Sequence, residues 1–149
     1  MLIKILILII FFSFLIPIFI IDLKKQIIPD YLSYSLIIVG LLINFFIKAD
    51  LLNIFLAITL SFAIFYLINF FAKLHYKKDA LGGGDAKLIA GIGAFLGLKA
   101  VLIIIYLSFI LGGVAGLILV LFKRKKKESY VAFGPIIIIA TCLFLLIHR

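Results

Sequence analysis

The sequence predicts an all-α integral membrane protein, a bundle of six transmembrane helices, on three observations. Hydrophobic residues make up 67% of the 149 residues, whereas soluble domains contain roughly half. These residues stand in unbroken runs rather than alternating with polar ones, which excludes the strands of a membrane barrel and leaves helices. The basic residues fall in the short gaps between the runs, where they act as topology signals.

The six apolar runs define the expected spans. We place them near residues 5–21, 32–47, 51–72, 86–98, 100–122 and 134–147. A helix needs about 20 apolar residues to cross a hydrocarbon core. The third and fifth runs reach this length, whereas the fourth is short and must borrow length from the glycine-rich segment before it. No long linker separates the runs, so residues 1–149 are expected to form a single domain.

The basic residues also predict how the bundle is oriented. Numbering the gaps alternately puts eleven of the fifteen Lys and Arg residues on one side: Lys24, Lys25, Lys73, Lys77, Lys78, Lys87, Lys123, Arg124, Lys125, Lys126 and Lys127. The positive-inside rule makes this side cytoplasmic and puts both termini outside. The net charge of +9 therefore indicates membrane topology and contact with anionic lipid headgroups, rather than nucleic acid.

Two of the six acidic residues stand at the cytoplasmic ends of apolar runs. Asp22 directly follows the first run, and Asp85 opens the fourth. A charge at the edge of the hydrocarbon is costly unless it has a role or a partner. Two neighbouring carboxylates do not both ionise readily, so one keeps a proton. Such a pair can activate water with one carboxylate and protonate a scissile carbonyl with the other, and it titrates as a unit.

Glycines surround the second of these acids. Gly82, Gly83 and Gly84 precede Asp85, and three glycines in a row permit positive φ and the close approach of another chain. We expect an extended substrate to lie against them. Small residues also allow helices to pack closely in membranes, and we expect this of the span glycines at positions 91, 93, 97, 112, 113 and 116.

Simpler interpretations of these residues remain open. An acid at the end of a span is often a solvated loop residue, which fits Asp30, Asp79 and Glu128. An ion-coupled small membrane transporter also carries intramembrane acids and glycine-broken helices, although the chain shows no internal repeat and no charge at the middle of a span. A structural or assembly protein is a further alternative. The single cysteine, Cys142, and the lack of paired metal-ligand spacing predict no metal and no cofactor.

Three segments resemble the motifs of one family. Residues 21–30, Ile-Asp-Leu-Lys-Lys-Gln-Ile-Ile-Pro-Asp, resemble the first signature of prepilin peptidases, the type IV leader peptidases among the Gly-x-Gly-Asp intramembrane aspartyl proteases. Residues 82–88, Gly-Gly-Gly-Asp-Ala-Lys-Leu, resemble the second signature. Phe133-Gly134-Pro135 resembles a further element before the last span. The motifs stand in the family's order and cover nearly the whole chain.

The resemblance implies a function and assigns roles. Prepilin peptidases cleave the basic leader of type IV pilin-like precursors at the cytoplasmic face of a prokaryotic plasma membrane, before a hydrophobic helix. Carried over, the catalytic pair is Asp22 and Asp85. Other motif residues are expected to bind substrate or support the site, and Asp30 in particular to cap the second span: Gly82, Gly83, Gly84, Pro29, Asp30, Lys87, Gly134 and Pro135.

The chain also departs from the resemblance at one place. Many bacterial members carry a cytoplasmic N-terminal region with paired cysteines, which is linked to methylation of the new terminus. Because this chain begins at the first catalytic span, we expect proteolysis without methyl transfer. A related protease that cuts signal-peptide remnants within the membrane remains an alternative, and the choice of substrate distinguishes the two.

Overall fold

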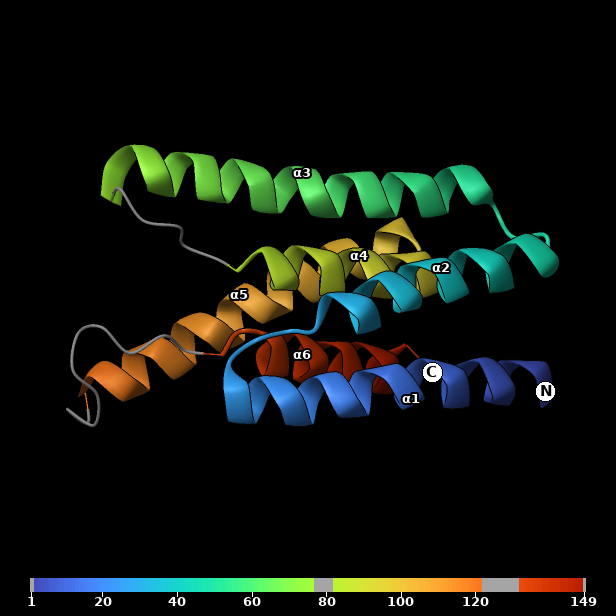
Figure 1. Ribbon diagram of the computed structural model, residues 1–149, viewed down its shortest axis with the longest axis horizontal. Helices are drawn as coiled ribbons and strands as arrows, with labels where there is room; N and C mark the ends of the chain where they lie inside the picture. The colour runs from blue at the N-terminus through green and yellow to red at the C-terminus, as the bar shows by residue number, and fades with distance from the viewer. Residues whose placement is uncertain (1, 77–81, 122–131, 149) are drawn as a thin grey trace.

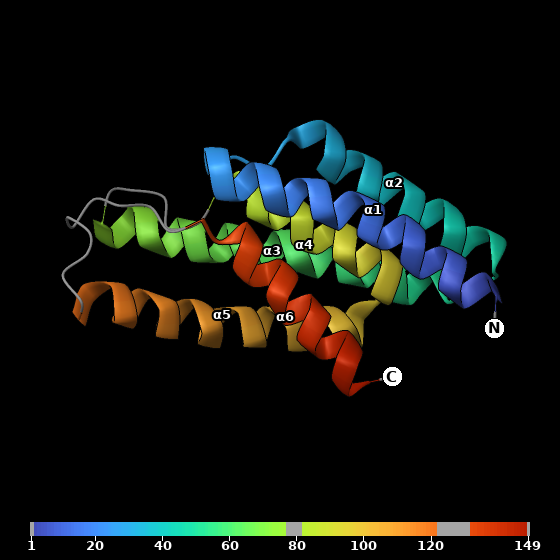
Figure 2. The ribbon, with the colours of Figure 1, turned by 90° about the horizontal axis from the view of Figure 1, so that it is seen from below.

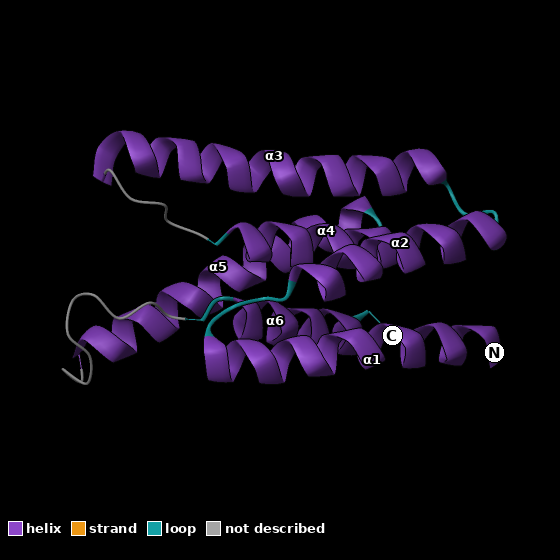
Figure 3. Cartoon of the chain, in the orientation of Figure 1, coloured by secondary structure: helices purple, strands orange, loops and turns teal. Residues whose placement is uncertain are grey.

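The computed structural model describes residues 2–76, 82–121 and 132–148. Within these ranges the chain forms helices and no strand, as Figure 3 shows. The helices are α1 (Leu2–Lys25), α2 (Asp30–Phe46), α3 (Leu51–Tyr76), α4 (Gly83–Leu96), α5 (Leu98–Leu121) and α6 (Gly134–Ile147). The predicted all-α class and the six predicted helices are confirmed for the described residues.

Several helices differ in their bounds from the predicted spans. α1 continues past residue 21 to Lys25, so Asp22 lies inside its last turn rather than after it. α4 ends at Leu96, because Gly97 adopts a φ of 81° and stops the helix. The predicted 86–98 span was therefore placed about two residues too late. Apolar runs report contact with lipid or core, whereas helix ends are decided by backbone hydrogen bonds, so the two boundaries differ.

Three described helices are long and apolar enough to cross a membrane. They are Leu2–Lys25, Leu51–His75 and Leu98–Ile118, with 24, 25 and 21 residues. α2 and α6 are apolar but shorter. The basic cluster at residues 123–127, on which the predicted orientation partly rests, lies outside the described residues. So do Lys77, Lys78, Asp79 and Glu128.

The short helix α4 lies at the centre of the bundle. Ten of its 14 residues are buried, and it contacts α2, α3, α5 and α6. In Figure 1 α3 runs along one side, α1 and α6 along the other, and α2 and α4 between them. Figure 2 shows the same bundle turned, with α5 and α6 along one edge. A helix enclosed in this way has its position fixed by its neighbours.

Glycines allow this close packing of α4. A Cβ at Gly91 would stand 2.6 Å from Leu36 Cδ2, and one at Gly93 would stand 2.9 Å from Val101 Cγ2. Both separations are too short for real carbon contacts, so glycine is required there. The predicted packing role is confirmed at these two positions and wrong at Gly113, where no neighbouring atom lies within 4 Å of the added carbon. The same open space surrounds Gly116.

Two asparagines hold the end of α4 that meets α5, which we call the far end of the bundle. Asn44 Nδ2 donates to the carbonyl oxygens of Ala94, at 2.8 Å, and Gly40, at 3.0 Å. Asn53 Oδ1 accepts a hydrogen bond of 2.9 Å from the backbone N–H of Leu98. The bonds to Ala94 and from Leu98 pair backbone groups that the break between α4 and α5 leaves without an intrahelical partner. The far end is thereby anchored.

Candidate active site

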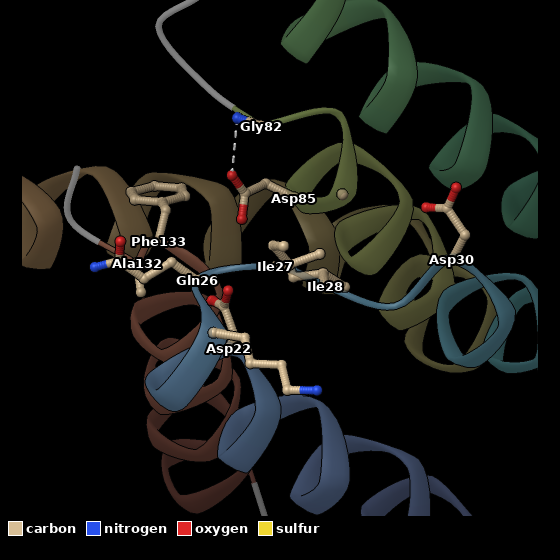
Figure 4. A pocket seen from close by; sticks show the side chains of 11 residues that line it. Asp22, Gln26, Ile27, Ile28, Asp30, Gly82, Asp85, Ala132 and Phe133 are labelled. Atoms are coloured by element: carbon tan, nitrogen blue, oxygen red, sulfur yellow. Dashed lines mark hydrogen bonds between the residues drawn. The ribbon is translucent and has the colours of Figure 1, made fainter.

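The first acid stands where α1 ends. Asp22 is 3% exposed, and its backbone oxygen accepts a hydrogen bond of 2.9 Å from the N–H of Gln26. Gln26 adopts a left-handed conformation with a φ of 54°, which is a common way to end a helix. The chain then turns and runs as a short extended loop to Pro29, along the side of the site that Figure 4 shows. The turn keeps Asp22 in the bundle while the chain leaves α1.

The second acid stands in the first turn of α4. Asp85 is 7% exposed, and its Oδ2 accepts a hydrogen bond of 3.1 Å from the backbone N–H of Gly82. In return, the N–H of Asp85 donates to the Gly82 carbonyl at 3.1 Å. This exchange joins the chain before α4 to its first turn and orients the carboxylate. The positive end of the α4 dipole also favours a carboxylate at this position.

A third segment, the start of α6, contacts the first acid. The backbone of Gly134 lies beside the Asp22 carboxylate. A Cβ on Gly134 would overlap Asp22 Oδ2. Gly134 is therefore a positioning residue, whose missing side chain makes room for the carboxylate. The following Pro135 is buried and stands in the first turn of α6, where a missing N–H costs no helix hydrogen bond.

The two carboxylates face one cavity. Asp22 and Asp85 both line a hollow of about 550 Å³. In Figure 4 the two side chains point toward the same space from opposite sides. Asp22 Oδ2 is buried and has no hydrogen-bond partner among the described residues. An unpaired buried oxygen beside a second carboxyl group is suited to hold a proton or to take one from water.

The predicted supporting residues divide into two groups. Five predicted site residues line the cavity: Asp22, Asp30, Gly82, Gly84 and Asp85. The other five do not line it but stand near it in the structure: Pro29, Gly83, Lys87, Gly134 and Pro135. Pro29 is the N-cap of α2, so the prediction that Asp30 caps this helix is wrong: Asp30 is the first residue of α2. Asp30 Oδ1 instead accepts a hydrogen bond of 2.7 Å from Lys87 Nζ, which lies 5.0 Å from the centre of the Tyr34 ring.

The glycines before Asp85 differ from their predicted behaviour. Gly97 is the one described glycine with a positive φ, so the run before Asp85 does not use that freedom. A Cβ at Gly84 would lie 2.9 Å from Ile28 Cβ. The chain that approaches Gly84 in the structure is therefore the protein's own loop, although Gly84 also lines the cavity. No atom of the described residues lies within 4 Å of a Cβ added at Gly83.

Several lining residues were not identified from the sequence. They are Lys25, Gln26, Ile27, Ile28, Ala132 and Phe133. All but Ala132 stand inside the quoted motifs, and Ala132 directly precedes one, so membership of a motif was the available signal. Phe133, Ile27 and Ile28 supply an apolar wall that the chemistry of the acids did not predict. Among the described residues, no group of three or more His, Cys, Asp and Glu side chains is arranged to hold a metal ion.

Comparison with known proteins identifies the family. Residues 9–117 match the model of the type IV leader peptidase family, and this stretch includes both Asp22 and Asp85. The chain belongs to the type IV leader peptidase family. The match covers well over half of the chain, and the start of α6, with Gly134, follows it.

Individual members of the family share about a third of their aligned residues with this chain. A prepilin leader peptidase/N-methyltransferase of Aeromonas salmonicida (strain A449) is 32% identical over 127 residues, which is 85% of this chain and 44% of the relative. The protein of the same name from Legionella pneumophila is 34% identical over 134 residues, with the same coverage of each chain. The one from Neisseria gonorrhoeae is 33% identical over 126 residues, 83% of this chain and 42% of the relative. The chain thus spans less than half the length of these relatives. No solved structure matches it significantly.

Proposed function

We propose that this protein is a membrane aspartic endopeptidase that removes the leader peptide of type IV pilin-like precursors. The observation that carries the proposal is the approach of two buried carboxylates to one cavity. Asp22 and Asp85 lie 63 positions apart in the chain, yet both line it. Family membership supports the choice of reaction, and the names of the relatives support the class of substrate.

The proposed reaction uses water and one shared proton. The ionised carboxylate takes a proton from a water molecule in the cavity while the protonated carboxyl group donates its proton to the scissile carbonyl oxygen. The water oxygen bonds to the carbonyl carbon and forms a neutral tetrahedral diol. The carboxyl group that was protonated by water then passes its proton to the leaving nitrogen, while one hydroxyl of the diol returns a proton to the other carboxylate. The carbon–nitrogen bond breaks, which releases an amine and a carboxylic acid and restores the single shared proton of the pair. The pair acts as a unit, so separate roles are not assigned.

The proposed setting is a prokaryotic plasma membrane, with residues 1–149 acting as one domain of six membrane-crossing helices. In the orientation predicted from the positions of the Lys and Arg residues, the cavity faces the cytoplasm and both termini lie outside. The described cations support the assignment, since Lys24 and Lys25 end α1 beside the cavity and Lys87 follows Asp85. Lys48 follows the end of α2, and Lys99 stands in the first turn of α5. Both lie at the far end of the bundle, away from the cavity. The excess of basic residues on the cavity side agrees with the positive-inside rule.

Cleavage of a purified pilin-like precursor in detergent tests the proposal. Asp22→Asn and Asp85→Asn are each expected to lower the rate by about 10²–10⁴-fold, because each removes one proton-transfer group. Asp50→Asn is the matched control, since Asp50 lies at the far end of the bundle, where its Oδ1 accepts a hydrogen bond from the Asn53 N–H. Full activity in either cavity variant, with the protein folded, rejects the proposal.

The same assay tests the choice of catalyst. Because the proposed mechanism activates water with carboxylates alone, a metal chelator is expected to leave the cleavage rate unchanged. Loss of activity that returns on adding a divalent metal contradicts the mechanism and indicates a metallopeptidase.

A further inference from the structure

A second hollow, with an apolar lining, lies between α1 and α6. It is a groove of about 360 Å³ lined by apolar side chains and one cysteine: Phe12, Leu15, Ile16, Phe19, Ile138, Ile139, Cys142, Leu143 and Leu146. No charged residue lines it. Several of its walls face outward, with Ile16 55% exposed and Ile139 47% exposed. The groove is therefore an open channel along the side of the bundle.

Both walls of this groove begin about one helical turn from residues at the catalytic cavity. Phe19 lies one helical turn before Asp22 on α1, and Ile138 lies one turn after Gly134 on α6. From these starting points the groove extends along α1 to Phe12, about 10 Å at 1.5 Å per residue, and about 12 Å along α6 to Leu146. Figure 1 shows the end of α1 and the start of α6 at the same end of the bundle. The groove thus starts near the site of the two acids and runs away from it along both helices.

Among the described residues, the opposite side of the cavity is enclosed by packed helices. Asp85 stands on α4, whose residues from Leu88 to Phe95 are all buried. α2, α3 and α5 pack around this helix. A helix arriving from the lipid therefore reaches the two acids from the side of α1 and α6, where the groove lies.

We propose that the groove holds the hydrophobic helix that follows the scissile bond of the precursor. This inference rests on the proposed function and specifies where its substrate binds. The scissile bond lies in the cavity, and the helix runs from there along α6, antiparallel to α1. An apolar surface gains little from leaving lipid, so association in a membrane depends on shape and contact area. A groove between two helices provides more contact with a third helix than a single convex helix face does.

The geometry predicts a register between the two chains. Cys142 lies eight residues after Gly134 on α6, about 12 Å along the helix axis. If the substrate helix starts at the cavity and runs parallel to α6, the substrate residue beside Cys142 follows the scissile bond by about eight positions. Substrate residues about one turn to either side share that face.

Cysteine cross-linking tests this register, because Cys142 is the one cysteine of the chain. Single cysteines are placed at successive positions of the precursor helix, and each precursor is mixed with Asp85→Asn enzyme under oxidising conditions. Disulfides to Cys142 are expected to peak about eight residues after the scissile bond and to recur with a helical period. The control carries Cys142→Ala with Leu60→Cys, on the exposed face of α3. It is expected to give few cross-links at any position.

The outcomes separate the docking site from the activity. A flat cross-linking profile, or equal yields for the two enzyme cysteines, overturns the docking proposal while wild-type cleavage of the precursor leaves the proposed function intact. Cross-links between the Cys142 residues of two enzyme molecules, in place of precursor, make the groove a dimer contact and also overturn it. Absence of cleavage by the wild-type enzyme rejects the proposed function itself.

A second measurement blocks the groove without altering the acids. Leu143→Trp narrows it, and Leu102→Trp makes the same exchange on the exposed face of α5 as a control. Each variant is assayed with the full precursor and with a short soluble peptide that spans the bond but lacks the helix. Leu143→Trp is expected to lower the ratio of precursor to peptide cleavage by about tenfold, and Leu102→Trp to leave it unchanged. An unchanged ratio in Leu143→Trp contradicts the proposal.

Discussion

The two ends of the central helix α4 bury polar side chains in opposite ways. At the far end, Asn44 donates both of its described hydrogen bonds to backbone oxygens, and Asn53 accepts one from the start of α5. At the cavity end, Asp22 Oδ2 is buried without a hydrogen-bond partner among the described residues. The helix is therefore anchored at one end, and at the other end it stands beside an unpaired carboxylate oxygen of α1.

This difference indicates a structural role for the polar side chains at the far end and a chemical role for those at the cavity end. A buried polar group that is fully hydrogen-bonded stabilises one arrangement, whereas an unpaired one costs free energy and needs another explanation. Paired and unpaired buried polar groups both occur here, on neighbouring helices beside the two ends of the 14-residue helix α4. Substitutions at the far end should therefore change stability more than the catalytic rate. Substitutions at the cavity end should change the rate more than stability.

Apart from the two acids themselves, the largest expected effect is at Gly134. Gly134→Ala introduces a Cβ that overlaps Asp22 Oδ2, so the carboxylate must move away from its position. A displacement of about 1 Å at a reacting group can cost about 10²-fold in rate, and we expect a loss of this size in precursor cleavage. The thermal midpoint in detergent should change little.

Gly116→Ala is the matched control for this substitution. It adds the same methyl group on α5, where nothing lies within 4 Å of it. A normal rate for Gly134→Ala shows that the contact between α6 and Asp22 does not position the carboxylate.

The second effect should appear in stability at the far end. Asn44→Leu removes the donor to the Ala94 carbonyl and leaves that buried oxygen unpaired. Such a loss costs about 1–3 kcal/mol of unfolding free energy, which denaturant titration in detergent micelles measures. The cleavage rate per folded molecule is expected to stay near that of the wild type. A variant that is equally stable but inactive reverses the roles assigned to the two ends.

A smaller loss is expected at Asn53. Its side chain pairs the first N–H of α5, at Leu98, from a position that is partly open to solvent. Asn53→Ala should cost about 1 kcal/mol, similar to the loss of a helix cap. The double variant with Asn44→Leu sharpens the comparison, because a larger than additive loss shows that the two asparagines hold the α4–α5 turn jointly.

The smallest effect concerns the ion pair beside the cavity. Lys87 Nζ lies 2.7 Å from Asp30 Oδ1, but the Asp30 side chain is 64% exposed. Exposed pairs contribute about 0–1 kcal/mol, so Asp30→Asn and Lys87→Met should each lower stability by less than about 1 kcal/mol. A double-mutant cycle measures the coupling between them. A coupling well above this range shows that the pair helps to fix α2 against α4.

Much of the fold was predictable because lipid imposes a simple rule on composition. Long apolar runs must form helices when no water is available to their backbones, and all six predicted helices appear among the described residues. Their ends were less predictable. Asp22 was expected just after a span but lies inside the last turn of α1, since backbone hydrogen bonding continues beyond the last apolar residue.

The candidate site was predictable where it depends on acidic residues, because these are rare in the chain. Only six acids occur in the chain, so acids at the ends of apolar runs were conspicuous, and Asp22 and Asp85 do line one cavity. The pairing of Asp30 with Lys87 was not predictable, because it joins α2 to α4 across 57 positions. The role of Gly84 was misjudged for the same reason: its neighbour, Ile28, comes from a distant segment.

The sequence by itself determined the helical class, the family and which two acids are candidates for the site. These depend on local composition and on motif residues close together in the chain. The tertiary structure alone decided what each acid contacts. The contact between Gly134 and Asp22 joins α6 to α1, and the apolar groove beside it exists only where those two helices meet. Contacts between distant segments depend on how the helices pack, and packing is a property of the whole folded chain.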